Sequence, residues 1–261
     1  MDILKKITEN TRREVALRKE QVSLKTLESS VFFTRKMPSF RDALNMSGPS
    51  IIGEFKRKSP SSGIISSREV EFVAKGYEQA GVSAISVLTD QTFFGGFDSD
   101  LLKAAAVTML PLLRKDFIID EYQVVEAKSI GASAILLIAS VLDKDEIKNL
   151  AELAFSLGLD VLFEIHMEEE LEKMNDRIRI IGVNNRNLNT FETDISQSAG
   201  LCSRLPGNCI RVAESGIKSP EDVLNLYNEG YDAFLIGETF MRSEDPGKTA
   251  KQFIEKISVS S

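Results

Sequence analysis

The stretch that decides the fold is residues 134–165, AILLIASVLDKDEIKNLAELAFSLGLDVLFEI. Two short apolar runs, Ala134–Ile138 and Val161–Ile165, flank a charged pattern of helical period. That helical pattern spans Lys144–Leu157 and is followed by Gly158. Runs that are continuously apolar are typical of parallel strands covered on both faces, and glycine after a helix lets the chain turn back into a strand. The stretch therefore predicts a parallel strand–helix–strand unit.

The same pattern recurs on both sides of this stretch. Six further apolar runs occur at Ser50–Phe55, Ala84–Leu88, Thr108–Leu112, Ile178–Val183, Ile210–Ala213 and Ala233–Ile236. Helical patterns between runs include Glu69–Gln79, Asp120–Lys128, Glu168–Met174 and Pro220–Glu229. Eight strand–helix units, at about 25 residues each, predict an α/β protein with a single (β/α)₈ TIM barrel. The alternative is a doubly wound open sheet, which usually has fewer strands and often a Gly-x-Gly-x-x-Gly turn that this sequence lacks.

Residues 1–46 have a different pattern of apolar and charged residues from the rest of the chain. Their apolar residues are spaced at roughly helical intervals among many Lys, Arg and Glu residues. We expect one or two amphipathic helices to about Leu27 and a short helix around Phe40–Leu44, before a break at Ser47-Gly48-Pro49-Ser50. The predicted organisation is an N-terminal helical extension, 1–46, packed on a barrel at 47–261, with one domain overall.

Composition excludes several classes of protein. The 261 residues include 32 Lys and Arg against 39 Asp and Glu, a net charge of −7, which argues against nucleic acid as a partner. Two cysteines, Cys202 and Cys209, and one histidine, His166, give neither a disulfide framework nor zinc-ligand spacing, so reduced thiols and no metal are expected. The sequence shows neither a signal peptide nor an apolar run long enough to span a membrane. We therefore expect a cytoplasmic protein without a membrane partner.

Polar side chains gather at the carboxyl ends of the apolar runs, where barrels carry their active sites. Glu54 and Lys56 are two residues apart at the end of one run, so both should point into the barrel mouth. Lys115 follows another run. Glu164 lies inside an apolar run, where a carboxylate must be paired or functional because isolated burial is costly. A structural ion pair for Glu54 and Lys56, and a solvated loop position for Lys115, remain alternatives.

The last two turns predict a phosphate site. Ser215-Gly216 and Gly237-Glu238 follow the seventh and eighth runs, where barrels often bind phosphate through loop amides and a helix N-terminus. Glu238 would offer its backbone N–H there. Phe93-Phe94 follows the second run and is either packing or an apolar wall for an aromatic substrate.

Motifs at these strand ends resemble the indole-3-glycerol-phosphate synthase family. They occur in family order over about residues 40–245, and the N-terminal helical segment also looks like that of the family. The matching motifs include Glu54-Phe55-Lys56-Arg57-Lys58-Ser59-Pro60, Ser86-Val87-Leu88-Thr89-Asp90 with Phe93-Phe94-Gly95-Gly96, Lys115-Asp116-Phe117, Glu164-Ile165-His166, Asn184-Asn185-Arg186, Glu214-Ser215-Gly216 and Leu235-Ile236-Gly237-Glu238. The Glu-x-Lys-x-x-Ser-Pro element is highly specific because it occurs together with Lys-Asp-Phe and Asn-Asn-Arg.

The resemblance implies closure of the ring of 1-(2-carboxyphenylamino)-1-deoxyribulose 5-phosphate, with loss of CO₂ and water, to indole-3-glycerol phosphate in tryptophan biosynthesis. No cofactor is implied. The partner is a small phosphosugar, and the chain is expected to be a monomer or weak homo-oligomer. By the family pattern Lys115 matches the general acid, Glu164 the general base or second proton carrier, and Lys56 the cation near the substrate carboxylate and the reacting centre. Accessory catalytic positions are Glu54, Asn184 and Ser215; substrate-binding positions are Ser59, Phe94, Arg186 and Leu235; phosphate-binding positions are Lys56, Ser215, Gly216, Gly237 and Glu238.

One departure from the family pattern lies in the loop after the first run. The family commonly begins the following helix with an Asp-Pro-like pair, whereas this chain reads Ser66-Ser67-Arg68-Glu69-Val70. Three alternatives to the implied activity remain: a phosphosugar isomerase, a Schiff-base aldolase, and a barrel that binds a phosphosugar without catalysis.

Overall fold

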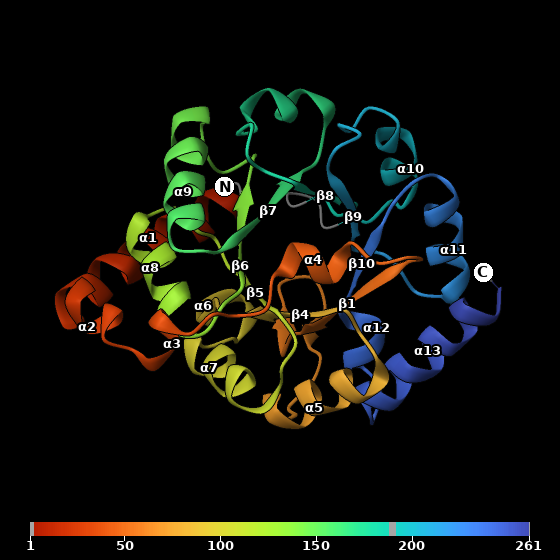
Figure 1. The fold of residues 1–261 in the computed structure, drawn as a ribbon, viewed down its shortest axis with the longest axis horizontal. Coiled ribbons are helices and arrows are strands. Elements are labelled where there is room, and N and C mark those ends of the chain that lie inside the picture. Colours follow the sequence, from red (N-terminus) through yellow and green to blue (C-terminus); the bar gives the residue numbers. More distant parts are fainter. Residues whose placement is uncertain (1–2, 188–191, 261) are drawn as a thin grey trace.

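The computed structural model describes residues 3–187 and 192–260, and it shows a closed barrel of eight parallel strands inside a layer of helices (Figure 1). Each strand pairs with the next along the chain, and the last closes on the first. This confirms the predicted (β/α)₈ barrel. The strands are β1 (Ser50–Phe55), β4 (Ala84–Leu88), β5 (Leu112–Lys115), β6 (Ala134–Ile138), β7 (Asp160–Ile165), β8 (Ile180–Asn184), β9 (Ile210–Glu214) and β10 (Ala233–Ile236).

Helices connect the strands and cover the outside of the barrel. The longer ones are α5 (Val70–Ala80), α7 (Asp98–Val107), α8 (Glu121–Ser129), α9 (Lys144–Ser156), α10 (Ser196–Cys202), α11 (Pro220–Asn228) and α13 (Pro246–Ser260). Short helices α6 (Gln91–Phe94) and α12 (Glu238–Met241) lie at strand ends, and the predicted helix after β7 is a 3₁₀ turn, η1 (Glu168–Lys173). In α9, Asp143 and Glu146 cap each other's backbone N–H groups, which explains why the helix begins there.

The third barrel strand begins later than the sequence pattern predicted. We expected it at Thr108–Leu112, but it runs from Leu112 to Lys115. Pro111 has no N–H to donate to a neighbouring strand, so its carbonyl alone joins the sheet, accepting from Ile85 N at 3.1 Å. The charged residues Arg114 and Lys115 are therefore part of the strand rather than the loop after it.

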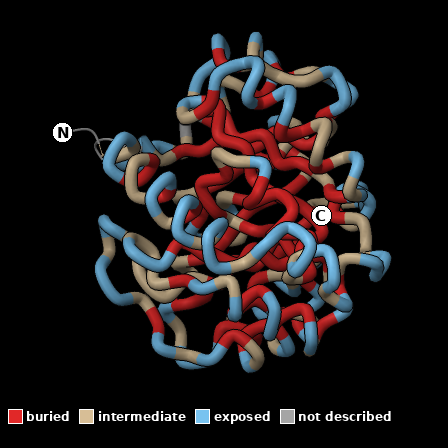
Figure 2. Tube along the Cα trace, turned by 90° about the vertical axis from the view of Figure 1, so that its left-hand side faces the viewer, coloured by how far each residue is buried: buried red, intermediate tan, exposed pale blue. Residues whose placement is uncertain are grey.

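A short helix, α4 (Phe40–Leu44), closes the amino-terminal end of the barrel. Phe40 and Leu44 are buried and pack into the same cluster as side chains from the barrel interior, including Ile52. Asp160, at the start of β7, accepts hydrogen bonds from the Ser39 hydroxyl and the Arg41 N–H. Figure 2 shows the buried trace concentrated in the barrel and the exposed trace at its periphery. The carboxyl-terminal end is left as the accessible end of the barrel.

The remaining N-terminal helices lie against α8 (Figure 1). They are α1 (Ile3–Gln21), α2 (Leu24–Glu28) and α3 (Val31–Thr34); α1, α2 and α4 correspond to the predicted helices. Arg18 pairs with Glu126 at 3.0 Å, and the Tyr122 hydroxyl donates to the carbonyls of Arg18 and Val22. Because these helices cover α8, all its residues after Glu121 are buried. The division of the chain at residue 46 stays a prediction.

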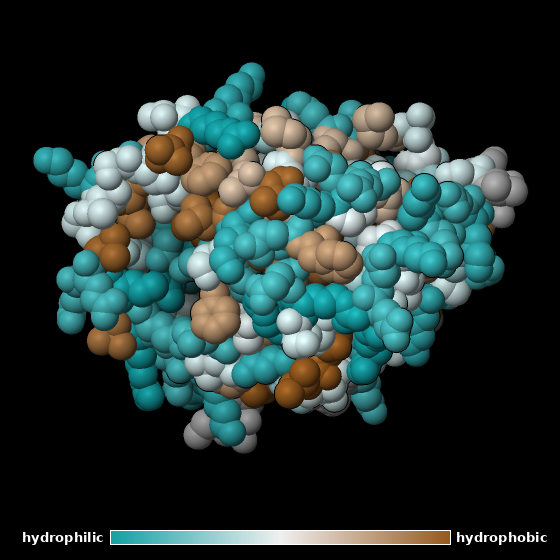
Figure 3. Space-filling view, turned by 90° about the horizontal axis from the view of Figure 1, so that it is seen from below, coloured by the Kyte–Doolittle hydropathy of each residue, from teal (hydrophilic) through white to brown (hydrophobic). Residues whose placement is uncertain are grey.

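None of the helices described has the length and apolar character that crossing a bilayer would need. The face in Figure 3 carries mostly hydrophilic side chains, with hydrophobic ones in separate small groups.

Candidate active site

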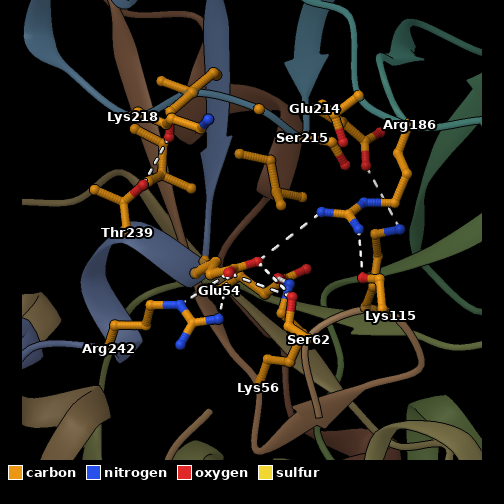
Figure 4. A pocket seen from close by; sticks show the side chains of 18 residues that line it. Glu54, Lys56, Ser62, Lys115, Arg186, Glu214, Ser215, Lys218, Thr239 and Arg242 are labelled. Carbon is orange, nitrogen blue, oxygen red and sulfur yellow. Dashed lines mark hydrogen bonds and ion pairs between the residues drawn. The ribbon is translucent and has the colours of Figure 1, made fainter. Parts of the chain in front are cut away.

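Two adjoining cavities, of about 540 Å³ and about 100 Å³, lie at the carboxyl ends of the strands. Figure 4 shows side chains from several strand ends pointing into this space. Every residue predicted for the site lines at least one cavity. Five of them line both: Glu54, Lys56, Lys115, Arg186 and Ser215. Ser61, which was not predicted, also lines both. Glu164, Asn184, Ser59 and Phe94 line the smaller cavity, and Gly216, Leu235, Gly237 and Glu238 line the larger one.

Lys115 is held between two buried carboxylates. As the last residue of β5 it points into the barrel, where its Nζ lies 2.9 Å from Glu164 Oε2 and 3.5 Å from Glu214 Oε2. The Glu164 and Glu214 side chains are each 1% exposed, so neither charge can be solvated by bulk water. A carboxylate buried this deeply is tolerated because an ammonium group lies within contact distance. The three side chains form one electrostatic unit.

Burial and the neighbouring charges shift the pKa values of these three groups. Burial opposes the charged form of Lys115, but Glu164, Glu214 and Glu54 outweigh it and raise the pKa of its ammonium above the ordinary value. Burial would raise the pKa of Glu164, yet Lys115 and His166 lower it overall. Burial together with Glu164 and Glu54 raises the pKa of Glu214 to about 8, against the opposing pull of Lys115. These shifts favour an ammonium on Lys115, an ionised Glu164 and a protonated Glu214 at neutral pH.

Glu214 was not among the predicted site residues. The sequence could have indicated it, because Glu214, like Glu164, is a carboxylate at the end of an apolar run. Its side chain crosses β8 at Gly182, where an added Cβ would lie 2.0 Å from Glu214 Oε1. Glycine at this position is therefore what makes room for the second carboxylate beside Lys115.

Glu54 and Lys56 form the second charged pair of the site. Lys56 Nζ donates to Glu54 Oε2 at 2.5 Å, so the side chains of the two residues point to the same side at the end of β1, as predicted. At Gly237 an added Cβ would lie 2.2 Å from Glu54 Oε2, so this glycine allows the carboxylate to pass. The pair joins the end of β1 to the turn after β10.

The turn after β9 has an unusual backbone. Ser215 has φ 66°, and among the described residues it is the one non-glycine in the left-handed region; Gly216 follows with φ 83°. Asn185 Nδ2 donates to the Ser215 carbonyl at 3.1 Å, and Asn185 Oδ1 accepts from the N–H and hydroxyl of Ser198. A left-handed serine costs about 1–2 kcal/mol, so the surrounding contacts must maintain it.

This strain gives a stability prediction. Ser215→Gly should be more stable than Ser215→Ala by about 1 kcal/mol, because both variants lose the hydroxyl and glycine alone adopts the left-handed region without a steric penalty. Urea unfolding of the two variants measures the difference. Equal midpoints would show that the turn is unstrained.

Arg186 and Glu238 connect the rim of the cavity. Arg186 Nη1 donates to the Ser61 hydroxyl at 2.5 Å, and its Nη2 lies 3.9 Å from Glu238. Glu238 also pairs with Arg242 at 2.7 Å and accepts from the Ser62 hydroxyl at 3.2 Å. These contacts tie the hairpin of β2 (Lys58–Ser59) and β3 (Gly63–Ile64) to helix α12. Further residues that line the larger cavity were not predicted, among them Ser61, Ser62, Lys218 and Arg242.

The smaller cavity has an apolar wall. Phe94 lies beside Phe117, with ring centroids 6.3 Å apart, and Leu88, Leu136 and Ile138 complete the wall. Asp90 Oδ1 accepts from the N–H groups of Phe93 and Phe94, so it fixes the short helix that carries Phe94. Of the Phe93-Phe94 pair, Phe94 lines the cavity.

The loop that departs from the family pattern is anchored by its own residues. Arg68 Nε donates to the Glu244 carbonyl at 2.7 Å, and Arg68 N–H and Nη1 donate to the Ser66 hydroxyl.

Cys202 and Cys209 are buried free thiols. In the part of the chain that the structure describes, the His, Cys, Asp and Glu side chains form no group of three or more that could hold a metal ion.

Comparisons with known proteins agree with the sequence motifs. The family model described as Indole-3-glycerol phosphate synthase matches residues 4–253. A protein of that name from Bacteroides thetaiotaomicron is 46% identical over 257 residues, covering 98% of this chain and 99% of that protein. Another of the same name, from Caldanaerobacter subterraneus, is 48% identical over 220 residues, covering 84% of this chain and 85% of that protein.

Solved structures with low sequence identity share the fold. A chain of the tryptophan synthase complex from Pyrococcus furiosus has a TM-score of 0.60 at 15% identity, covering 80% of this chain and 98% of that one. The 3-hexulose-6-phosphate synthase from Salmonella typhimurium has a TM-score of 0.65 at 11% identity, covering 81% of this chain and 100% of that one. By its family match and its close relatives, this chain belongs to the indole-3-glycerol phosphate synthase family.

Proposed function

We propose that the protein catalyses closure of the pyrrole ring of 1-(2-carboxyphenylamino)-1-deoxyribulose 5-phosphate, with loss of CO₂ and water, and so acts as a carboxy-lyase that forms indole-3-glycerol phosphate. The observation that carries the proposal is the Lys115 ammonium held between Glu164 and Glu214 at the open end of the barrel. Passive binding of a phosphosugar would not require two carboxylates buried around a lysine.

The chemistry explains the need for an ammonium and a carboxylate. Attack of the aromatic carbon on the ketone builds negative charge on the carbonyl oxygen, which Lys115 can stabilise and protonate as general acid. The attacking carbon then loses its carboxylate as CO₂, and the electrons of that bond restore the aromatic ring. Dehydration requires an acid to protonate the departing hydroxyl and a base to remove a proton from the intermediate, and the ionised Glu164 is suited to be that base. Lys56, paired with Glu54, supplies a second positive charge near the reacting centre. Asn184 would orient groups in this centre: its side chain hydrogen-bonds Glu164, and its Oδ1 accepts from Arg186 N–H.

The two cavities suit the two ends of the substrate. The larger one contains the turns at Ser215-Gly216 and Gly237-Glu238, whose backbone N–H groups would bind the phosphate together with Lys56. The smaller one, with Phe94, would take the aromatic ring, while Ser59, Arg186 and Leu235 contact the substrate between them. No step of this reaction calls for a metal or organic cofactor. A cytoplasmic location and a monomeric or weakly associating state stay predictions.

Turnover of the carboxyphenylamino substrate by the purified chain, followed by indole fluorescence, tests the proposal. Formation of indole-3-glycerol phosphate would support it, and binding without turnover would favour a silent phosphosugar-binding barrel. Borohydride treatment with substrate tests the Schiff-base alternative: we expect no covalent adduct, whereas mass spectrometry would find one on a lysine of an aldolase.

The phosphate turn gives a separate prediction. Ser215→Asp places a negative charge beside the proposed phosphate position and should raise KM by about tenfold or more, since like charges in contact cost over 1 kcal/mol in a partly desolvated site. Ser215→Asn, similar in size and uncharged, is the matched control. Equal KM values for the two variants would remove residues 215–216 from the phosphate site.

A further inference from the structure

A buried arginine lies directly before the proposed general acid. Arg114 precedes Lys115 on β5, so alternation directs its side chain away from the cavity and into the helical layer. Its guanidinium is 1% exposed and pairs with Asp98 at 2.7 Å, Glu126 at 2.8 Å and Asp116 at 3.3 Å. It also donates to the Thr89 hydroxyl and to the Gln123 carbonyl. One side chain therefore joins the residue after β4 to β5, α7 and α8.

The register of β5 extends one residue further along β4 than along β6. The register with β4 includes Leu88↔Lys115, and Thr89 N–H donates to the Lys115 carbonyl. The register with β6 ends at Arg114↔Ile135, one residue before Lys115. On the β6 side the pairing thus stops one residue before the one that carries the ammonium, so side chains can add support there.

The residue after Lys115 belongs to the same network. Asp116 Oδ2 accepts from the Thr89 hydroxyl at 2.6 Å and from Arg114, and its Oδ1 accepts from Phe117 N–H at 2.8 Å. Both neighbours of Lys115 in the chain are therefore bound to each other and to Thr89. Fixing the residues on either side sets the direction in which the Lys115 side chain leaves the backbone.

The charges around Arg114 make this network sensitive to geometry. Three carboxylates face one guanidinium, and Arg18 supplies a second cation 3.0 Å from Glu126. A planar guanidinium can donate to several acceptors at once in fixed directions, which a lysine ammonium on a flexible stem cannot do. The arrangement uses the geometry of arginine as well as its charge.

We propose that Arg114 is a positioning residue for the reaction: together with Thr89 and Asp116 it holds the end of β5 so that the Lys115 ammonium lies between Glu164 and Glu214. This inference rests on the proposed function. Arg114 touches neither cavity, so it acts through Lys115 rather than on the substrate.

Kinetics of Arg114→Lys and Thr89→Val test the proposal. Arg114→Lys keeps the charge and loses the fork of donors, and kcat should fall by about tenfold to a hundredfold, since small misplacements of a catalytic group have effects of this size. KM should stay within about twofold, because the substrate contacts are intact. Thr89→Val removes one hydroxyl from the network and should lower kcat in the same way, by a smaller factor. Arg177→Lys is the matched control, since Arg177 pairs with Glu152 at the surface and should leave kcat unchanged.

A double-variant comparison separates positioning from a general effect on the fold. In a Lys115→Ala background, followed in single turnovers, Arg114→Lys should cause no further loss, because the group it positions is absent. Equal fractional losses in both backgrounds, or an unchanged kcat in folded Arg114→Lys and Thr89→Val, would overturn the proposal. If Arg114→Lys does not fold, Thr89→Val in the two backgrounds decides it. Absence of turnover by the wild-type chain would instead contradict the proposed function and this inference with it.

Discussion

Lys115→Ala is expected to lower kcat by about 10²- to 10⁴-fold, the usual contribution of a positioned general acid, while the barrel stays folded. The Lys115 ammonium is the cation that contacts both Glu164 and Glu214, at 2.9 and 3.5 Å, and Lys56 is already paired with Glu54. Its loss therefore leaves no proton donor of the same kind at that place. Steady-state turnover, with thermal unfolding to confirm folding, measures the effect.

The matched control is Lys251→Ala, which removes an exposed lysine from α13 on the outside of the barrel. We expect it to keep wild-type kcat. A Lys115→Ala variant that stays folded and retains kcat within about threefold of wild type would show that the acid is another group, and Lys56 would be tested next.

The sequence predicts those features of the site that follow from strand alternation. Glu54 and Lys56 are two residues apart on a strand, so their common face follows from the period of two, and the structure gives the contact. Glu164 stands out because a carboxylate in an apolar run requires a partner. The glycine after α9 has φ 73°, as the cap pattern predicts.

Relations between distant segments could not be predicted in the same way. The contact between Lys115 and Glu214 joins residues almost 100 positions apart and depends on barrel closure, on strand register and on Gly182 being small enough to let Glu214 pass. The end of β5 was misplaced because its outward residue is Arg114, whose burial depends on carboxylates from α7 and α8. Periodicity assumes that charged residues face water, and a buried ion network breaks that assumption.

Glu164→Gln and Glu214→Gln are expected to differ sharply, although both carboxyl groups are buried against Lys115. Lys115 and His166 outweigh burial and hold the pKa of Glu164 below its ordinary value, so at pH 7 the substitution removes a charge and the proposed base. The expected loss in kcat is about 10²- to 10⁴-fold. Burial beside Glu164 and Glu54 raises the pKa of Glu214 to about 8, so at pH 7 glutamine resembles its protonated form, and the loss should be below about tenfold.

The raised pKa of Glu214 also predicts how stability depends on pH. Between the ordinary value of 4.5 and about 8, the folded chain keeps a proton that the unfolded chain loses, so this group destabilises the fold progressively as the pH rises through that window. Glu214→Gln removes the effect. The stability difference between this variant and the wild type should therefore shift in favour of the variant between pH 5 and pH 9. We expect a shift of about 1 kcal/mol or more, which corresponds to about 2–4 °C in Tm for a chain of this size.

Thermal unfolding and kcat of both variants at pH 5, 7 and 9 measure these differences. Equal losses of kcat at pH 7 would show that the two carboxyls share one charge, and that the ionised base cannot be assigned to Glu164 alone. A Tm difference between Glu214→Gln and wild type that is independent of pH would show that Glu214 is ionised throughout, so that Lys115 neutralises both carboxylates. The comparison thus decides which carboxyl holds the proton next to the ammonium, and that proton distribution would let Lys115 and Glu164 serve as the proposed acid and base at the same pH.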